Sequence, residues 1–356
     1  MDSNQVASVR VGPTVIYPPL RFLLGQAAHP KFAAFFCSRN CLLPHAPGMT
    51  GKTLWCSSLI GIALLSITSI FWTEIGPPWP TSSRSDALSL GQTDRSITVA
   101  FWNMQWFPGG HPHPSRNEKF RQIGSVRADM ARFNPDIFGM EEVRDFKNAT
   151  MAVKPWPGFK VDVCANFPPR EGHDQAQEVA IASRLQPLSA WAEQWKPNGA
   201  LVPPRGFAFA AYQLAPDRLL LFYAVHLKSN LGEIAENIAI REESMRQLGS
   251  HMAAMEQAYG RLGRITWAVG GDCNTSLDDQ QFAAETTLRR LIDNGFVWCW
   301  RNVSPRARVT LPPDKGFPPA CFDHIFVRGS AIRKAWVVRS SPHSSDHRPV
   351  VAVLDM

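Results

Sequence analysis

Six short polar motifs lie at the ends of apolar runs in this 356-residue chain, and they constrain its fold more than any other feature. Strands that stop at polar residues direct those side chains toward one edge of a sheet. We therefore expect a sheet protein whose Asn, Glu, His and Asp side chains gather at one edge. In chain order the motifs are FWNMQW (101–106), GMEEV (139–143), AVHLKSN (224–230), GGDCN (270–274), FDHIF (322–326) and SSDH (344–347).

The apolar runs themselves predict many strands with a few helices between them. Amphipathic spacing predicts helices over 115–133, where Ser115 and Glu118 fit a capping box, and over 234–258. Segments 185–206 and 301–319 are expected to be loops. An α+β fold of two packed sheets covered by helices accommodates this order. The predicted strands are 97–103, 137–140, 178–183, 207–214, 219–226, 265–271, 322–327, 334–339 and 347–354.

An apolar segment precedes the folded domain. Residues 54–72 contain no charge and are long enough to cross a bilayer as a helix, while basic residues dominate before them. Two interpretations stay open: a membrane anchor, or the apolar part of a signal peptide that starts at Met1 or Met49. Both export the domain, either anchored in an inner membrane on the extracytoplasmic side or secreted or periplasmic. The predicted organisation is an N-terminal segment (1–53), the apolar segment (54–72), a linker (73–95) and a domain (96–356).

Composition limits the class of protein. Apolar residues make up 45% and charged residues 19%, which is typical of a globular chain, and a net charge of +7 is compatible with a polyanionic substrate. The seven cysteines include no CxxC pair, which argues against a zinc site. In an exported domain, Cys299 and Cys321 are predicted to form a disulfide. We expect a monomer.

Two carboxylates and one amide are the candidate metal ligands. Glu142 follows one apolar run and Asp346 precedes another, and Mg²⁺ prefers oxygen ligands of this kind. Asn103 ends the first strand and would contact the metal or its water without adding charge. Each of these residues taken alone is more often a simple strand-end residue, so the prediction depends on their joint occurrence.

The remaining motif residues suit acid–base work on a phosphate. Asp272 could hold or deprotonate an attacking water, and Asn274, two residues on, would donate to a phosphoryl oxygen. His226 and His347 would stabilise the charge of a pentavalent phosphate, with Asp323 orienting one of them. Lys228 is a further candidate for phosphate binding.

In this order the motifs resemble the endonuclease/exonuclease/phosphatase superfamily, over roughly residues 96–356. The resemblance implies a four-layer α/β/β/α sandwich of two mixed sheets, and a mechanism with Mg²⁺ or Mn²⁺ and one activated water. It assigns the metal to Glu142. The segment EVAIASR (178–184) is similar to the family strand that ends in Ser-Arg, which makes Arg184 a substrate-binding candidate. The chain departs from the family at Glu141, where Gln is usual, and at Glu178, where Gly is usual.

Three functions remain open at this stage. The first is a metal-dependent nuclease that cleaves DNA or RNA phosphodiesters, which the basic 301–319 segment favours. The second is a phosphatase or phosphodiesterase of lipid or inositol head groups, which a domain anchored through 54–72 would meet. The third is a binding module without catalysis. The expected partners are accordingly nucleic acid, or a lipid or inositol phosphate, together with the membrane.

Overall fold

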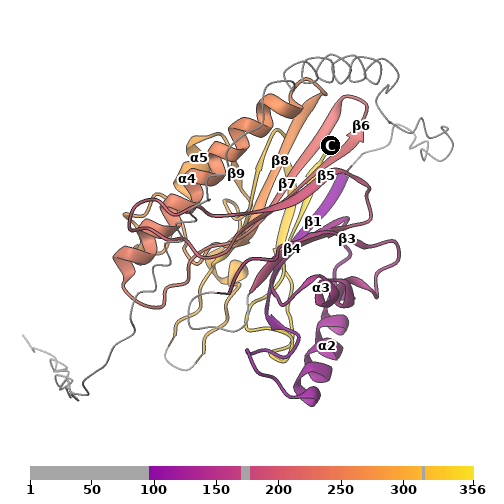
Figure 1. Cartoon of the computed structure of the whole chain (residues 1–356), viewed down its shortest axis with the longest axis vertical. Helices are drawn as coiled ribbons and strands as arrows, with labels where there is room; N and C mark the ends of the chain where they lie inside the picture. Colours follow the sequence, from indigo (N-terminus) through magenta and orange to yellow (C-terminus); the bar gives the residue numbers. More distant parts are fainter. Residues whose placement is uncertain (1–95, 170–176, 315–316) are drawn as a thin grey trace, which may run out of the picture. The chain divides into compact units, whose positions relative to one another are not determined.

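The computed structural model describes residues 96–169, 177–314 and 317–356 (Figure 1). They belong to the second of two units into which the chain divides, Leu88–Met356. They form two six-stranded mixed sheets with helices on their outer faces, as predicted. The segments predicted at 1–53, 54–72 and 73–95 lie outside the described residues.

The first sheet contains both ends of the described domain. Its central strand β1 pairs in parallel with β2 and antiparallel with β12, so strands far apart in sequence are neighbours. In spatial order the sheet contains β11 (Ile332–Val337), β12 (Val350–Asp355), β1 (Ser96–Phe107), β2 (Ile137–Val143), β4 (Glu178–Ser183) and β3 (Lys160–Cys164).

The second sheet is built from the middle of the chain. Its strands β7 and β8 are parallel and fully paired, and β10 runs antiparallel to β8. In spatial order the sheet contains β5 (Pro187–Gln194), β6 (Gly206–Ala215), β7 (Arg218–His226), β8 (Arg264–Asp272), β10 (Asp323–Arg328) and β9 (Val297–Trp298).

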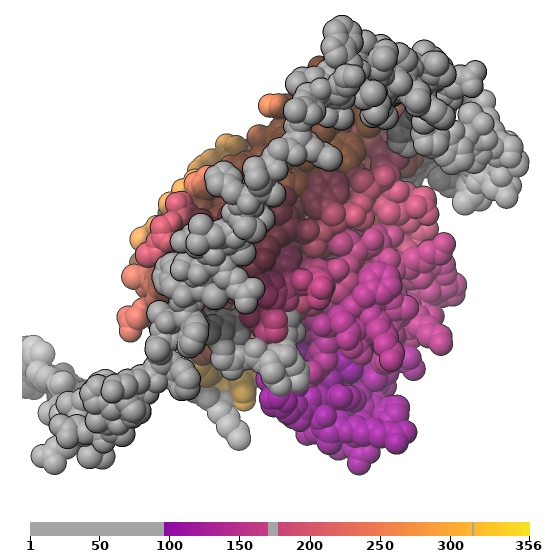
Figure 2. Space-filling view, in the orientation of Figure 1, coloured from indigo at the N-terminus to yellow at the C-terminus, as the bar shows by residue number. Residues whose placement is uncertain are grey.

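Helices cover both outer faces. Helices α2 (Arg116–Met130) and α3 (Phe146–Val153) lie on the first sheet, and α4 (Ile234–Tyr259) and α5 (Arg289–Asp293) lie on the second (Figure 1). In the space-filling view, the side that carries α4, in orange, and the first part of the described domain, in indigo and magenta, lie on opposite sides of the face shown (Figure 2). Short 3₁₀ helices span Gln280–Phe282 and Pro305–Arg308.

The two sheets pack through aromatic rings that need glycine opposite them. Phe101 of β1 stacks on Phe222 of β7 with ring centroids 4.7 Å apart. A Cβ on Gly139 or Gly270 would lie 2.5 Å from the Phe101 ring, so neither position accepts a side chain without displacing it. Each buried Phe contributes roughly 1.5–3 kcal/mol. The first glycine of the GGDCN motif therefore serves packing between the sheets, not close approach to a ligand.

The strand directions bring the polar motifs to one end of the sandwich. Strands β1, β2, β7 and β8 all run toward this end, where their carboxyl termini lie. Strands β10 and β12 begin there, because each is antiparallel to a strand that ends there; the first residue of β10, Asp323, pairs with the last residue of β8, Asp272. The expectation that strand-end side chains meet at one edge is therefore confirmed.

Several elements differ from the sequence prediction. The segment 185–206 contains strand β5, whose Pro187 start and half-buried polar residues are typical of an edge strand and give little apolar signal. Strands β3 and β9 and helices α3 and α5 were also missed. Helix α2 has the predicted capping box; its Phe120 is 59% exposed and its Gln122 is buried.

The loop expected at 301–319 is in part ordered against the core. Arg308 is buried, pairs with Asp278 and donates to the carbonyls of Trp300 and Val303. The predicted disulfide is wrong, because Cys299 and Cys321 are free buried thiols. Burial raises the pKa of both thiols, which disfavours the thiolate that disulfide formation needs.

None of the helices in the described part of the chain is long and apolar enough to cross a membrane. The apolar segment 54–72 lies outside that part. The anchor or signal peptide, and with it the export of the domain, therefore stays a prediction.

Candidate active site

Asn103 joins the two sheets at the polar end of the sandwich. It is buried on β1, and its Nδ2 donates to Glu142 Oε1 at 3.1 Å and to Asp272 Oδ2 at 3.0 Å. Its Oδ1 accepts the backbone N–H of Gln105 at 3.0 Å. The structure therefore shows Asn103 holding two carboxylates in place. Its expected contact with a metal or a metal-bound water stays a prediction.

Glu142 reaches the site through an irregularity in β2. The pairing of β2 shifts register between Glu141 and Val143, and Glu142 has a φ of 57°, a left-handed conformation that is strained for a residue other than glycine. The bulge turns the side chain of Glu142 toward Asn103, and its Oε2 accepts the backbone N–H of Trp106 at 3.1 Å. Along a regular strand, Glu141 and Glu142 would point to opposite faces of the sheet.

His226 and Asn274 follow the parallel strands of the second sheet. His226 Nε2 lies 3.7 Å from Glu142 Oε1 and 3.6 Å from Asp272 Oδ2. Asn274 has a φ of 53°, and its Nδ2 donates to the Leu227 carbonyl at 3.2 Å. Its backbone N–H donates to Asp272 Oδ1 at 2.9 Å, so Asn274 fixes the carboxylate beside it.

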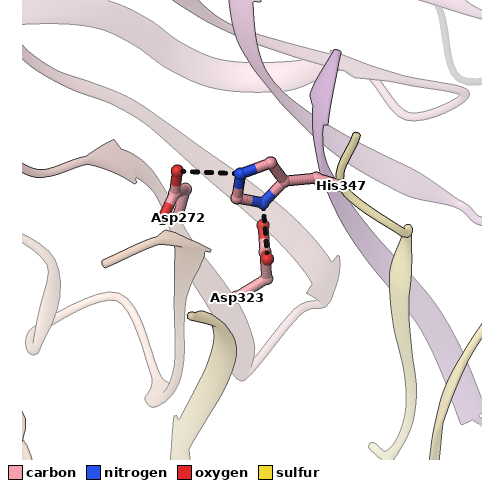
Figure 3. A group of neighbouring side chains, drawn as sticks. All are labelled: Asp272, Asp323 and His347. Atoms are coloured by element: carbon pink, nitrogen blue, oxygen red, sulfur yellow. Dashed lines mark hydrogen bonds and ion pairs between the residues drawn. The ribbon is translucent and has the colours of Figure 1, made fainter. Parts of the chain in front are cut away.

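His347 lies between two aspartates (Figure 3). Its Nδ1 donates to Asp323 Oδ2 at 2.8 Å, and its Nε2 lies 3.7 Å from Asp272 Oδ2. Asp323 thereby fixes the tilt of the ring and directs Nε2 toward the end of β8. This is the orienting role that the sequence assigned to Asp323.

The SSDH motif is fastened to β1. Trp102 Nε1 donates to the His347 carbonyl at 3.0 Å, and Ser345 Oγ donates to the Asn103 carbonyl at 2.7 Å. Asp346, between them, is exposed, and its backbone N–H donates to Gln105 Oε1 at 3.1 Å. The loop therefore fixes His347 inside the site and leaves the Asp346 carboxylate at its surface.

Burial and charge shift the pKa values of the two imidazoles in opposite senses. Burial raises the pKa of Asp272 to about 7, although the charge of His347 opposes this. Burial lowers the pKa of His347, but the neighbouring Asp323 and Asp272 more than compensate and hold it well above its ordinary value. Burial, with the nearby Arg205, holds the pKa of His226 well below its ordinary value. The site thus contains one charged and one neutral imidazole.

Another buried carboxyl group, that of Glu141, lies beneath the site. It is fully buried, its two oxygens have no hydrogen-bond partner, and a Cβ on Gly271 would lie 2.8 Å from one of them. Burial, reinforced by Asp323 and Asp272, raises its pKa well above the ordinary value. Asp323 Oδ1 and His226 Nδ1 also have no partner. Such crowding of unsatisfied groups is typical of functional sites and unfavourable for stability.

The part of the sequence that contains this cluster matches a known protein family. The model described as the Endonuclease/Exonuclease/phosphatase family matches residues 100–347. The chain belongs to this family. A search of curated proteins finds no match. Family membership assigns the chain to the hydrolases that act on phosphoesters.

Solved structures of family members share the fold. The endonuclease/exonuclease/phosphatase from Beutenbergia cavernae DSM 12333 is 17% identical with a TM-score of 0.55, covering 74% of this chain and 72% of that one. D. rerio TDP2 complexed with a single-strand DNA product is 15% identical, with a TM-score of 0.53, covering 74% and 100%. The human Nocturnin catalytic domain with bound sulfate is 15% identical, with a TM-score of 0.54, covering 73% and 93%. At these identities the likeness shows the fold.

The carboxylates at the mouth of the site fit the divalent cation of the family. Burial raises the pKa of Glu142 and the charge of Asp346 raises it further, while the hydrogen bond from Asn103 and the charge of Arg205 oppose the shift. The donors are oxygens, which Mg²⁺ and Mn²⁺ prefer. Asp272, Asp323 and His347 also offer ligand atoms within 4.8 Å of one another. Both ring nitrogens of His347 already face carboxylates, which favours the Glu142 side for the cation.

Two predicted substrate-binding residues do not join the cluster. Arg184 follows β4, which runs antiparallel to β2, so it lies at the opposite end of the sheet from Glu142. There it donates to Asn134 and lies over the Phe159 ring. Lys228 is close in sequence to His226 but buried, and its Nζ donates to carbonyls of its own loop at 2.9–3.0 Å.

Sequence reasoning missed two residues that support the site. Arg205 donates to the carbonyls of His226 and Leu227, and it lies in a segment with no readable pattern. Gln122 on α2 donates to the carbonyls of Met104, Gln105 and Ser344, and so connects β1 to the SSDH motif. A signal for Gln122 existed: it lies four residues before the buried Val126, on the inward face of α2.

Proposed function

We propose that this chain is a divalent-metal-dependent nuclease that hydrolyses DNA or RNA phosphodiesters by attack of an activated water. The observation that carries the proposal is the contact between Asp272 and the imidazoles of His226 and His347, next to the Glu142 carboxylate. Together these groups supply a base, an oxyanion donor and a metal ligand within one buried cluster. The single-strand DNA product in the complex of D. rerio TDP2, which shares this fold, supports a nucleic-acid substrate.

Glu142 would hold the cation, with Asp346 as a further oxygen donor. When bound, Mg²⁺ or Mn²⁺ supplies Lewis-acid stabilisation of the charge that develops on the phosphoryl oxygens. Asn103 keeps the Glu142 and Asp272 carboxylates apart and directed to the same region, since it donates to both. Mg²⁺ or Mn²⁺ is proposed as the metal.

The proton steps are assigned to the buried groups. Asp272 orients the attacking water and accepts its proton as the water's oxygen bonds to phosphorus. The bond from phosphorus to the leaving ester oxygen breaks in the same displacement, and that oxygen keeps the bonding pair and takes a proton from solvent water. His347, held charged and oriented by Asp323, donates a hydrogen bond from Nε2 to a phosphoryl oxygen. His226, neutral at physiological pH, donates from Nε2 to the same group. Asn274 holds Asp272 through its backbone N–H.

A substrate panel tests the proposal. The protein is incubated with Mg²⁺ or Mn²⁺ and plasmid DNA, RNA, sphingomyelin or inositol phosphates, with an Asp272→Asn variant as the matched control. We expect cleavage of DNA or RNA by the wild type alone. Hydrolysis of a lipid or inositol head group with intact nucleic acid would replace the proposed substrate, and no hydrolysis of any substrate would indicate a binding module.

A further inference from the structure

A buried ion pair lies behind the active site, between α4 and the loop that follows β8. Arg241 and Glu285 are nearly inaccessible, and they form two parallel hydrogen bonds of 2.8 Å each. Taking two charges out of water costs several kcal/mol per ion, which the attraction between them does not reliably recover. A buried ion pair is therefore weak evidence for a stabilising role. The other hydrogen bonds of Arg241 and Glu285 indicate what role the pair has.

Those contacts reach the two loops that leave the catalytic strands. Arg241 Nη1 donates to the Lys228 carbonyl at 3.1 Å and to Asn230 Oδ1 at 2.9 Å, both in the loop after β7. Glu285 accepts the hydroxyl of Thr275 at 3.0 Å in the loop after β8, and the hydroxyl of Thr287 at 2.6 Å. The pair therefore connects the loop after His226 to the loop after Asp272.

A continuous chain of hydrogen bonds runs from the pair to the base. Asn230 accepts from Arg241 through Oδ1 and donates through Nδ2 to the Asn274 carbonyl at 2.8 Å. The backbone N–H of Asn274 in turn donates to Asp272 Oδ1 at 2.9 Å. Asn274 has a left-handed φ of 53°, so it needs such support to keep its conformation.

We propose that Arg241 and Glu285 are positioning residues for catalysis, which fix Asn274, and through it the Asp272 carboxylate, by way of Asn230. This inference rests on the proposed phosphodiesterase activity. None of the three contacts the reacting atoms. A bidentate guanidinium–carboxylate pair has a fixed geometry, so it transmits the position of α4 to the site more rigidly than a lysine would.

The test uses three variants of the full chain. Asn230→Ala cuts the connection to Asn274 and leaves the ion pair intact. Arg241→Lys keeps the charge but loses the bidentate geometry. Arg246→Lys is the matched control, because Arg246 lies on the same helix and forms a half-exposed ion pair with Glu243 that has no contact with the site. The kcat and KM for bis(p-nitrophenyl) phosphate with Mg²⁺ and with Mn²⁺, and the Tm, are measured for each.

We expect Asn230→Ala to lower kcat about tenfold to a hundredfold, the range for a misplaced catalytic group, with KM within about twofold and Tm close to wild type. Arg241→Lys should lower kcat in the same direction, and Arg246→Lys should change neither constant. A wild-type kcat in the Asn230→Ala variant overturns the inference, as does a loss of activity that scales only with Tm.

Hydrogen exchange at the Asn274 amide separates this inference from the proposed function. Exchange should be faster in Asn230→Ala than in wild type and unchanged in Arg246→Lys. If the wild type cleaves no phosphoester, the proposed function fails and this exchange decides the positioning network by itself. Equal exchange rates in wild type and Asn230→Ala then overturn it.

Discussion

Two buried polar clusters lie at opposite ends of the same sandwich and differ in how their charges are satisfied. At the end away from the active site, the Asp162 carboxylate accepts the hydroxyls of Ser183 and Tyr212, each at 2.6 Å. At the active-site end, Glu141, Asp323 and His226 each retain buried atoms without a partner. The first cluster is satisfied and the second is not.

The difference distinguishes polar groups that stabilise the fold from polar groups that serve a function. The two short hydroxyl bonds oppose the effect of burial, which still raises the pKa of Asp162, and they tie β3, β4 and β6 together. A cluster with unpaired hydrogen-bond acceptors and with Asp272 beside Asp323 lowers the stability of the fold. Such a cluster is typical of a site where a ligand binds or a reaction occurs. The contrast predicts opposite mutational behaviour at the two ends.

Removing His347 should have the largest effect on activity. His347→Ala deletes the charged donor between Asp323 and Asp272, and we expect kcat to fall by about three orders of magnitude. The fold should persist in circular dichroism. Near-normal turnover in this variant would show that the cluster is not the catalytic one.

Changing Glu142 should alter the metal requirement. Glu142→Gln keeps the size of the side chain and removes the charge that would attract the cation. The Mg²⁺ concentration for half-maximal activity should rise by about tenfold or more. An unchanged Mg²⁺ titration would remove Glu142 as a ligand and would favour the group of Asp272, Asp323 and His347.

The cluster at the opposite end should respond in stability alone. Tyr212→Phe removes one of the two hydroxyls on Asp162, and we expect a loss of about 1–2 kcal/mol in the free energy of unfolding, measured by urea denaturation. The kcat of the variant should equal that of wild type. A fall in kcat without a fall in stability would contradict the division between the two ends.

Replacing Glu178 should have the smallest effect, a change in Tm that depends on pH. Burial raises its pKa to about 7, whereas the unfolded chain has an ordinary value of 4.5. The folded state therefore loses stability as pH rises from about 4.5, and the loss is complete above about 7. Glu178→Gln should raise Tm by a few degrees at pH 8 and by little at pH 4. An equal Tm difference at both pH values contradicts the assignment.

The sequence predicted the site because strand ends are local features. His226 and Asp272 are the last residues of β7 and β8, and parallel strands bring such residues together without knowledge of the loops. Asn103 was expected to end the first strand, but β1 continues to Phe107. Strand direction is not local. Arg184 was a candidate only through the family resemblance, and because β4 is antiparallel to β2 it lies at the opposite end of the sheet from Glu142.

Irregular backbone and long-range support were beyond sequence reasoning. The bulge at Glu142 brings both adjacent glutamates to the site, although alternation along a regular strand would separate them, and it depends on pairing with β1 and β4. Arg205 acts from a segment without periodicity. Edge strand β5 has a half-buried polar pattern that resembles a loop. In each case the missing information lies in the partner strand rather than in the residue.

The most direct test compares phosphodiester hydrolysis by wild type and Asp272→Asn with Mg²⁺ and with excess EDTA. Asp272 is the residue that contacts Asn103, Asn274 and both imidazole rings. The predicted result is hydrolysis that requires both the metal and Asp272, with circular dichroism spectra that coincide. Metal-independent hydrolysis, or an Asp272→Asn variant with wild-type turnover, would contradict the assignment of this cluster as a metal-dependent active site.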